Sequence, residues 1–203
     1  GGSNDGGSGT ISGNTLNVKA SASAQNIHNF DTINFYFTNT LSPKLTLSDT
    51  AGTTIKSLKG ISVNGLPKNM SGTLIENRSG TITVTDGTSS VTKTGDTAET
   101  ILSTDTTNKK IDYTRYIFKG ARTAESSSFH ETWGGRSVIG NTTTDNVITV
   151  SSGTHTDVYG GWTRGASSQT ATADKGNSTD NKVTVDGTAT VSGVVYGGMT
   201  TVA

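Results

Sequence analysis

One short pattern restricts the fold of this chain more than any other feature: an aromatic residue followed by two glycines. It occurs at Trp133-Gly134-Gly135, Tyr159-Gly160-Gly161 and Tyr196-Gly197-Gly198. A second pattern recurs with it, an Asn followed by aliphatic residues two and four positions later. This pattern occurs in "NTLNV" (14–18), "NVITV" (146–150) and "NKVTV" (181–185). Its period of two predicts a strand with one buried face.

The repeats differ in length because the last carries a longer loop, within "ASSQTATADKGNSTD". Short strands recurring at such intervals, with no helical periodicity between them, predict an all-β fold of the parallel β-helix (β-solenoid) type. In this prediction each aromatic fills a narrow core beneath a bend, and the two glycines adopt backbone conformations that other residues avoid. Asn14, Asn146 and Asn181 are expected to fall in equivalent register and to stack as a ladder.

The repeat disappears between about residues 20 and 128. Alternating pairs continue there, and they predict further strands at Leu45 and Leu47, Ile61 and Val63, Ile82 and Val84, and Ile111 and Tyr113. The predicted organisation is therefore a coil at 1–19 that enters from an upstream repeat, irregular coils or a β-rich insert at 20–128, and repeats at 129–203. Together they are expected to form one elongated domain, an excerpt of a longer array.

Composition agrees with a thin fold and excludes several functions. Only 30% of the residues are hydrophobic, which suits a narrow core better than a wide one. The formal net charge is zero and no basic block occurs, so nucleic acid is not an expected partner. The absence of cysteine excludes disulfides and thiolate chemistry. No signal peptide and no apolar run long enough to span a membrane is found.

The units "N-x-V-T-V … V-Y-G-G", interrupted by "A-x-N-I-x-N-F-D-x-I-N-F-Y" and then by "L-T-L" and "G-T-I-T-V", resemble passenger regions of bacterial autotransporters and related surface adhesins, as in Negativicutes and Fusobacteria. The resemblance covers nearly the whole chain. It implies a right-handed parallel β-helix, export to the surface of a Gram-negative bacterium, and roles in adhesion, aggregation or biofilm formation. It also implies a membrane-inserted barrel, which these residues do not include, so membrane attachment is expected only through such a segment.

Catalytic and metal-binding patterns are weak. The three histidines, His28, His130 and His155, are far apart and lack paired metal-ligand spacing, so neither a metal nor a cofactor is expected. Carboxylates could serve a glycosidase-like site if they clustered on one face. The candidates mostly border turns, where solvated turn caps are the favoured interpretation: Asp145, Asp157, Asp174, Asp180 and Asp186.

The predicted ligand-contact residues are Trp162 and its neighbour Arg164, because a planar aromatic that points outward can stack on a sugar or anchor a protein. The alternative is that Trp162 covers the neighbouring coil. The favoured function is a non-enzymatic adhesin or stalk segment that contacts a host or bacterial surface glycan or protein. Two alternatives stay open: a filament subunit that self-associates through solenoid ends or faces, and a carbohydrate-active β-helix enzyme.

Overall fold

The protein is all-β, as the sequence predicts. A computed structural model describes residues 9–38, 41–65, 71–94, 98–125, 129–138, 142–164 and 176–201, with the side chains of residues 93, 94, 121–125, 129, 130, 138 and 164 excepted. Among these residues there is no α-helix, only one 3-10 turn, η1 (Leu58–Gly60). The chain divides into two compact units, the first made of residues 1–92 and 100–115 and the second of residues 93–99 and 116–203.

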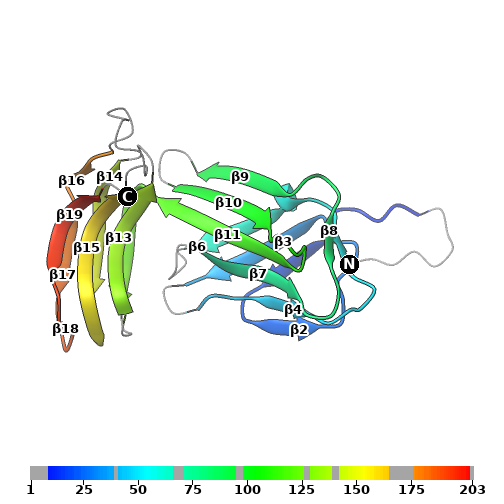
Figure 1. The fold of residues 1–203 in the computed structure, drawn as a ribbon, viewed down its shortest axis with the longest axis horizontal. Coiled ribbons are helices and arrows are strands. Elements are labelled where there is room, and N and C mark those ends of the chain that lie inside the picture. Colours follow the sequence, from blue (N-terminus) through cyan, green and yellow to red (C-terminus); the bar gives the residue numbers. More distant parts are fainter. Residues whose placement is uncertain are drawn as a thin grey trace. The chain divides into compact units, whose positions relative to one another are not determined.

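The strands of the first unit pair mainly in parallel (Figure 1). In chain order they are β1 (Thr15–Val18), β2 (Ala22–Ala24), β3 (Thr32–Phe37), β4 (Leu45–Leu47), β5 (Thr53–Ile55), β6 (Ile61–Gly65), β7 (Ser71–Asn77) and β8 (Ile82–Val84), followed by β9 (Ser89–Thr94), β10 (Ala98–Thr104) and β11 (Lys110–Ile117), which extend into the second unit. Three parallel sets result: β1-β3-β6, β2-β4-β7 and β5-β8. Each set joins strands from successive stretches of the chain, but the sequence separation of paired residues varies, from 17 for Thr15 and Thr32 to 30 for Leu45 and Ile75.

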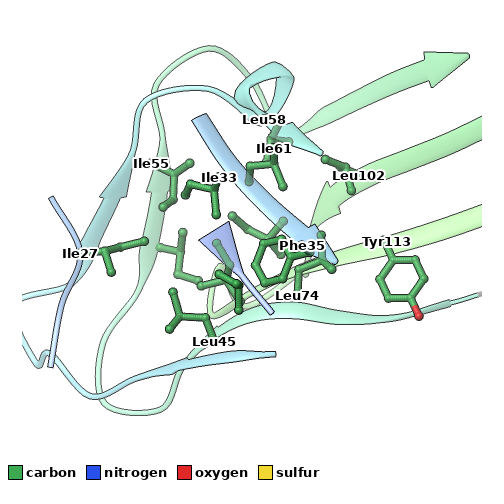
Figure 2. Close-up of a cluster of buried hydrophobic side chains, with 14 of the residues drawn as sticks. Ile27, Ile33, Phe35, Leu45, Ile55, Leu58, Ile61, Leu74, Leu102 and Tyr113 are labelled. Carbon is green, nitrogen blue, oxygen red and sulfur yellow. The ribbon is translucent and has the colours of Figure 1, made fainter. Parts of the chain in front are cut away.

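The core of the first unit confirms the predicted alternation. Burial in β4 and in β11 alternates residue by residue, so one side chain in two points inward. Figure 2 shows Phe35 among aliphatic side chains from strands of all three parallel sets and from η1. Phe35 and Leu74 are fully buried, and the ring of Phe37 meets that of Tyr113 edge to face, 5.2 Å between centroids.

The sheet that contains β7 and β11 is mixed, which corrects the expectation of purely parallel pairing. β11 pairs antiparallel with β7, opposing Ile111 to Ile75, and it also pairs with β10. Just beyond this pairing, the backbone N–H of Asn77 donates to the carbonyl of Lys109 at 2.8 Å. The antiparallel strand thus covers the edge that β7 would otherwise present. An exposed parallel edge is open to unwanted strand addition, and a strand of reversed direction closes it.

One buried arginine stabilises the end of another parallel set. The Nη1 group of Arg115, on β11, donates to the carbonyls of Val63 (3.0 Å) and Gly65 (2.8 Å) on β6. Arg115 is only 9% exposed, and burial lowers its pKa, although a guanidinium stays charged at neutral pH. Its Nε atom has no hydrogen-bond partner among the described residues. Two carbonyls of β6 therefore depend on this side chain.

Arg115→Met is expected to lower the free energy of unfolding of the first unit by about 2 kcal/mol, because it keeps the volume but removes both donors. Hydrogen exchange of the amides in β3 and β6 measures the change. Arg78→Met is the matched control, since the Arg78 side chain is 68% exposed and its carboxylate partner lies 3.7 Å away. Equal losses in the two variants would show that the contacts to β6 are not what stabilises this edge.

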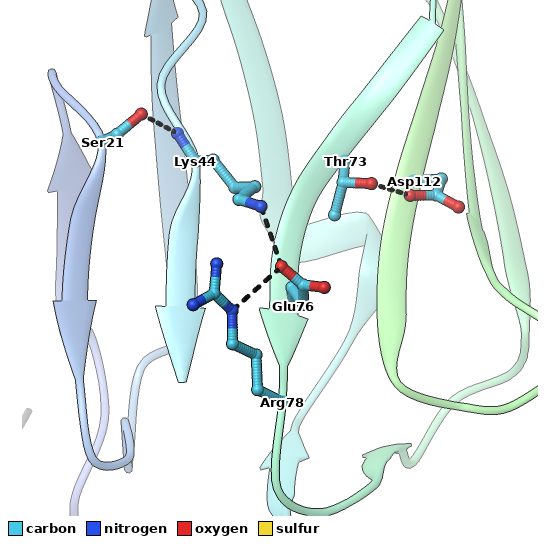
Figure 3. Close-up of polar contacts among 6 residues, drawn as sticks. All are labelled: Ser21, Lys44, Thr73, Glu76, Arg78 and Asp112. Carbon is cyan, nitrogen blue, oxygen red and sulfur yellow. Dashed lines mark hydrogen bonds and ion pairs between the residues drawn. The ribbon is translucent and has the colours of Figure 1, made fainter. Parts of the chain in front are cut away.

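Polar side chains line the solvent face of β4, β7 and β11 (Figure 3). The Nζ group of Lys44 lies 2.8 Å from the carboxylate of Glu76, and Arg78 Nε lies 3.7 Å from the same oxygen. Thr73, also on β7, donates from its hydroxyl to the Asp112 carboxylate on β11 at 2.6 Å. The hydrogen bond from Lys44, the largest cause, and the charges of Lys44 and Arg78 hold the pKa of Glu76 below its usual value of 4.5.

Glu76 makes the first unit sensitive to acid. A carboxyl group whose pKa is lowered by folding stabilises the protein above its unfolded pKa, and this stabilisation is lost as the pH falls through the folded value. We therefore expect Glu76→Gln to flatten the decline in unfolding free energy between about pH 5 and pH 3. Urea unfolding across this range measures it. Lys44→Gln should flatten the curve in the same direction, and curves parallel to wild type for both variants would contradict the assignment.

The strands of the second unit lie in three levels, each made of consecutive strands. Level one is β12 (Lys119–Glu125) and β13 (Phe129–Val138), and level two is β14 (Thr143–Val150) and β15 (Thr154–Arg164). Level three is β16 (Ser178–Thr179), β17 (Lys182–Val185), β18 (Thr190–Val191) and β19 (Val195–Thr201). Every pairing between levels is parallel. Ile117, the last residue of β11, pairs antiparallel with Arg136 of β13.

The Asn-led strands lie one above the other, as predicted. Val150 pairs with Val185, and the side-chain amide of Asn146 donates to Oδ1 of Asn181 at 2.9 Å. The prediction is wrong for Asn14, whose neighbour in the next strand is Asp31: the Asn14 N–H donates to the Asp31 carboxylate at 3.3 Å. The ladder of asparagines therefore forms where two successive levels both carry Asn.

Candidate outer face of the second unit

The two faces of β15 carry different side chains. Val158 packs with Ile148 and Val150 of β14, between the two sheets of the unit. Because neighbouring residues of a strand point to opposite faces, Tyr159 lies on the face turned away from β14. We call this surface of β13, β15 and β19 the outer face. The predicted bend is wrong, since the motif lies inside strands, although Trp133 and Tyr159 are buried as predicted.

The glycine pair shifts the alternation of the strand by one residue. Tyr159 and Trp162 are three positions apart, which in a regular strand puts them on opposite faces, yet their rings stack 5.0 Å apart with an interplanar angle of 23°. Thr163 then points back inside, where its hydroxyl lies 3.1 Å from that of Thr143 on β14. Gly160 and Gly161 absorb this shift, so both aromatic rings reach the same surface.

These glycines are needed for close approach and not for an unusual backbone. None of the six glycines of the motif is among those with positive φ, which corrects the predicted reason for them. A Cβ atom on Gly160 would overlap the carbonyl oxygen of Gly197 in the next level. One on Gly135 would overlap the side chain of Asn146, and one on Gly161 that of Asn181. The glycine pairs thus make room for the adjacent level and for the asparagine ladder.

Equivalent residues of the three levels form two columns on the outer face. The first column is Trp133, Tyr159 and Tyr196, and the second is Arg136, Trp162 and Met199, each in register with the next. The rings of Tyr159 and Tyr196 stack 5.0 Å apart and nearly parallel, at 2°. The guanidinium of Arg136 lies 4.3 Å from the centre of the Trp162 ring, a cation–π contact. Trp133 and Tyr159 are only 4% and 6% exposed.

Two carboxylates border these columns. Glu131 lies 3.7 Å from Arg136, and Asp157 accepts a 2.8 Å hydrogen bond from the backbone N–H of Val194 in the next level. Burial, followed by the negative charges of Asp157 and Glu131, raises the pKa of Tyr159. The phenol of Tyr159 therefore stays protonated at neutral pH, and the outer face has a neutral aromatic centre beside an ion pair.

Trp162 covers both neighbouring levels. Besides Arg136 of level one, it contacts level three through its indole N–H, which donates to the hydroxyl of Thr201 at 3.0 Å. These contacts fit the alternative interpretation of Trp162, as a cover for adjacent coils, and its ring also remains half-buried at the surface. The backbone of Arg164 pairs with Thr201, but its side chain lies outside the described residues. A ligand-contact role for this pair stays a prediction.

The histidines and acids considered for chemistry do not come together in the described part of the chain. His155 is fully buried; its Nε2 donates to the carbonyl of Ser152 (2.9 Å), and its Nδ1 lies 2.6 Å from the Thr132 hydroxyl. His28 is exposed in the first unit, and the side chain of His130 is outside the described residues, as is Asp174. No group of three His, Cys, Asp or Glu residues able to hold a metal occurs among the described residues.

The two Asp residues that precede the ladder asparagines share an unusual backbone conformation, although Asp145 lies within β14 and Asp180 at the bend before β17. Asp145 and Asp180 both have left-handed backbones, with φ of 53° and 54°, a conformation that Asp tolerates better than most residues. They occupy matching positions on adjacent levels. Asp145 lies 3.1 Å from Lys119 Nζ. Asp157 accepts a hydrogen bond from the backbone N–H of Val194 in level three, and Asp186 accepts one from the backbone N–H of Gly187. Asp180 thus stands at a bend, Asp157 and Asp186 cap backbone N–H groups, and Asp145 lies in a strand beside Lys119.

Comparison of the chain with protein families, with curated proteins and with solved structures finds no match. Within the described residues, no helix is long and apolar enough to cross a membrane.

Arg136 and Met199 are the residues of the outer face that the sequence motif alone does not indicate. Both follow a glycine pair directly, at the position that Trp162 holds in level two. The signal that could have found them is therefore equivalence within the repeat, extended one residue beyond the glycines. Tyr196 and Trp133 are found by the motif itself.

Proposed function

We propose that the chain is a segment of a right-handed β-solenoid in a bacterial surface protein of the autotransporter-passenger type, where it acts as a stiff stalk with an adhesive side. One observation carries the proposal: in the second unit, equivalent residues of successive levels lie in register on both sheets. Trp133, Tyr159 and Tyr196 align, and so do Val150 and Val185. Such level-on-level stacking is what lets repeat proteins extend in one direction.

The outer face is the proposed adhesive side. Trp, Tyr, Arg and Met are the residue types enriched where proteins bind one another, and the two columns consist of these types alone. Tyr159 contacts two other rings, so little of its ring is open for a sugar to stack on. A protein on a host or bacterial surface, contacted through ring edges, Arg136 and Met199, is therefore the partner that this face fits best.

The test is adhesion of beads coated with the purified chain to bacterial and epithelial cells under flow. We expect more attachment than with albumin-coated beads, and a loss of about tenfold for Arg136→Ala combined with Met199→Glu. The matched control is Lys182→Glu, an exposed residue of β17 on the other sheet. Attachment no better than albumin would remove the adhesive role and leave a stalk. Circular dichroism of each variant separates loss of adhesion from loss of fold.

A second candidate function, a filament subunit, is favoured by the third level. Val185, Val194 and Val195 there are 46%, 49% and 47% exposed. β19 has no charged residue, although edge strands of soluble proteins are commonly protected by charge. Electron microscopy of the purified chain at high concentration tests this function. Short, monodisperse particles would exclude filament assembly, and extended fibres would favour it over a stalk.

A further inference from the structure

The first unit has a hollow of about 290 Å³. Its lining includes the segment His28–Asp31, between β2 and β3, and the exposed residues Thr54, Lys56 and Thr85. Ile11 and Phe30 line it too, and Phe30 also packs against the core cluster. The hollow thus combines an apolar patch with groups that donate and accept hydrogen bonds.

The charges in this hollow cancel. Lys56 Nζ forms an ion pair with Asp31, whose other carboxylate oxygen accepts the 3.3 Å bond from the Asn14 N–H. The hydrogen bond from Lys56 is the main cause that lowers the pKa of Asp31, so this carboxyl stays charged at neutral pH. A free ion would find no unpaired opposite charge here. An apolar ligand would strip water from the ion pair and the hydroxyls without replacing their hydrogen bonds.

We propose that this hollow binds a neutral sugar residue. A pyranose has hydroxyls that both donate and accept, which suits Asp31, Lys56, Asn29 and the threonine hydroxyls, and it has an apolar C–H face that suits Phe30 and Ile11. A volume of about 290 Å³ is at the lower end of ligand sites and has room for a single sugar residue. The site is separate from the outer face, and either can exist without the other.

Titration of the complete chain with neutral methyl glycosides of glucose, galactose, mannose and N-acetylglucosamine, followed by amide NMR shifts, tests the site. At least one glycoside should give saturable shifts confined to residues near 28–31, 54–56 and 85, with millimolar affinity. Sulfate, the anionic probe, should give none. Comparing a single glycoside with an oligosaccharide ending in the same sugar tells whether a free sugar or a glycan end is preferred.

Thr54→Val is expected to weaken the binding about fivefold, because it removes one hydroxyl from the wall and keeps the shape. Its control is Thr83→Val, because Thr83 is the register partner of Thr54 on β8 and does not line the hollow. The proposal is overturned if no neutral glycoside gives saturable shifts. It is equally overturned if sulfate binds more tightly than every glycoside, or if the two valine variants weaken binding alike.

Discussion

Gly160→Ala is expected to lower the free energy of unfolding of the second unit by about 3 kcal/mol, while Gly197→Ala changes it by less than about 0.5 kcal/mol. The two glycines hold the same position in the motif. Neither has a positive φ, so alanine is allowed by the backbone at both. Only their surroundings differ: the new Cβ at Gly160 would overlap the Gly197 carbonyl and lie 2.9 Å from Asn181 Cβ, whereas Gly197 has nothing within 4 Å.

Urea unfolding followed by tryptophan fluorescence measures both variants. Trp133 and Trp162 are the only tryptophans of the chain and both belong to the second unit, so the signal reports on that unit alone. Main-chain atoms of the next level cannot move aside without breaking its pairing, which is why the expected loss is at the upper end for an added methyl group. A similar small effect in both variants would mean that the levels are not packed as closely as the register requires.

The positions of many strands could be predicted from the sequence because the alternation of apolar and polar residues is a local pattern. Leu45 and Leu47, or Ile111 and Tyr113, alternate with polar residues over a few positions, and a strand buried on one face needs nothing more. The Asn146–Asn181 contact could be predicted for a different reason. Both residues occupy the same place in a repeat, and stacking of repeats brings such residues together.

The physical reason for the glycine pairs could not be predicted from the sequence, although the pairs themselves are easily recognised in it. A glycine can be required by a positive φ or by a neighbour that leaves no room for a side chain, and a sequence does not distinguish the two. Here the neighbour is decisive. The space beside Gly135 is occupied by Asn146, which belongs to the other sheet of the unit.

The long-range polar contacts and the antiparallel pairing of β11 could not be predicted from the sequence either. Arg115 and Val63 are 52 positions apart, and no repeat relates them. The reversal of direction at β11 depends on which strand edge is left open after β7, a property of the assembled sheet. The hollow in the first unit likewise draws Ile11, Phe30 and Thr85 from separate segments.

Asn181→Ala is expected to cost the second unit about 3 kcal/mol, because the side chain makes four hydrogen bonds, three of them to residues of level two. Its Oδ1 accepts from the backbone N–H (3.1 Å) and the side-chain amide (2.9 Å) of Asn146. Its Nδ2 donates to the Thr143 carbonyl and the Ser178 hydroxyl, at 3.3 and 3.2 Å. Asn146 is fully buried, so the donors left behind cannot turn to water.

Asn146→Ala should cost less, about 1.5 kcal/mol, because it removes a buried amide whose Oδ1 already has no donor among the described residues. The double variant should then be little worse than Asn181→Ala alone, since the two side chains act through one contact. Thr179→Ala is the control: its hydroxyl also bridges two levels, to Thr144 at 3.3 Å, but the pair is exposed and water can replace it. Additive losses of unfolding free energy for the two asparagine variants would show that the two side chains stabilise the unit separately. A loss for Thr179→Ala as large as that for Asn181→Ala would show that burial is not the reason why the asparagine contact is stabilising.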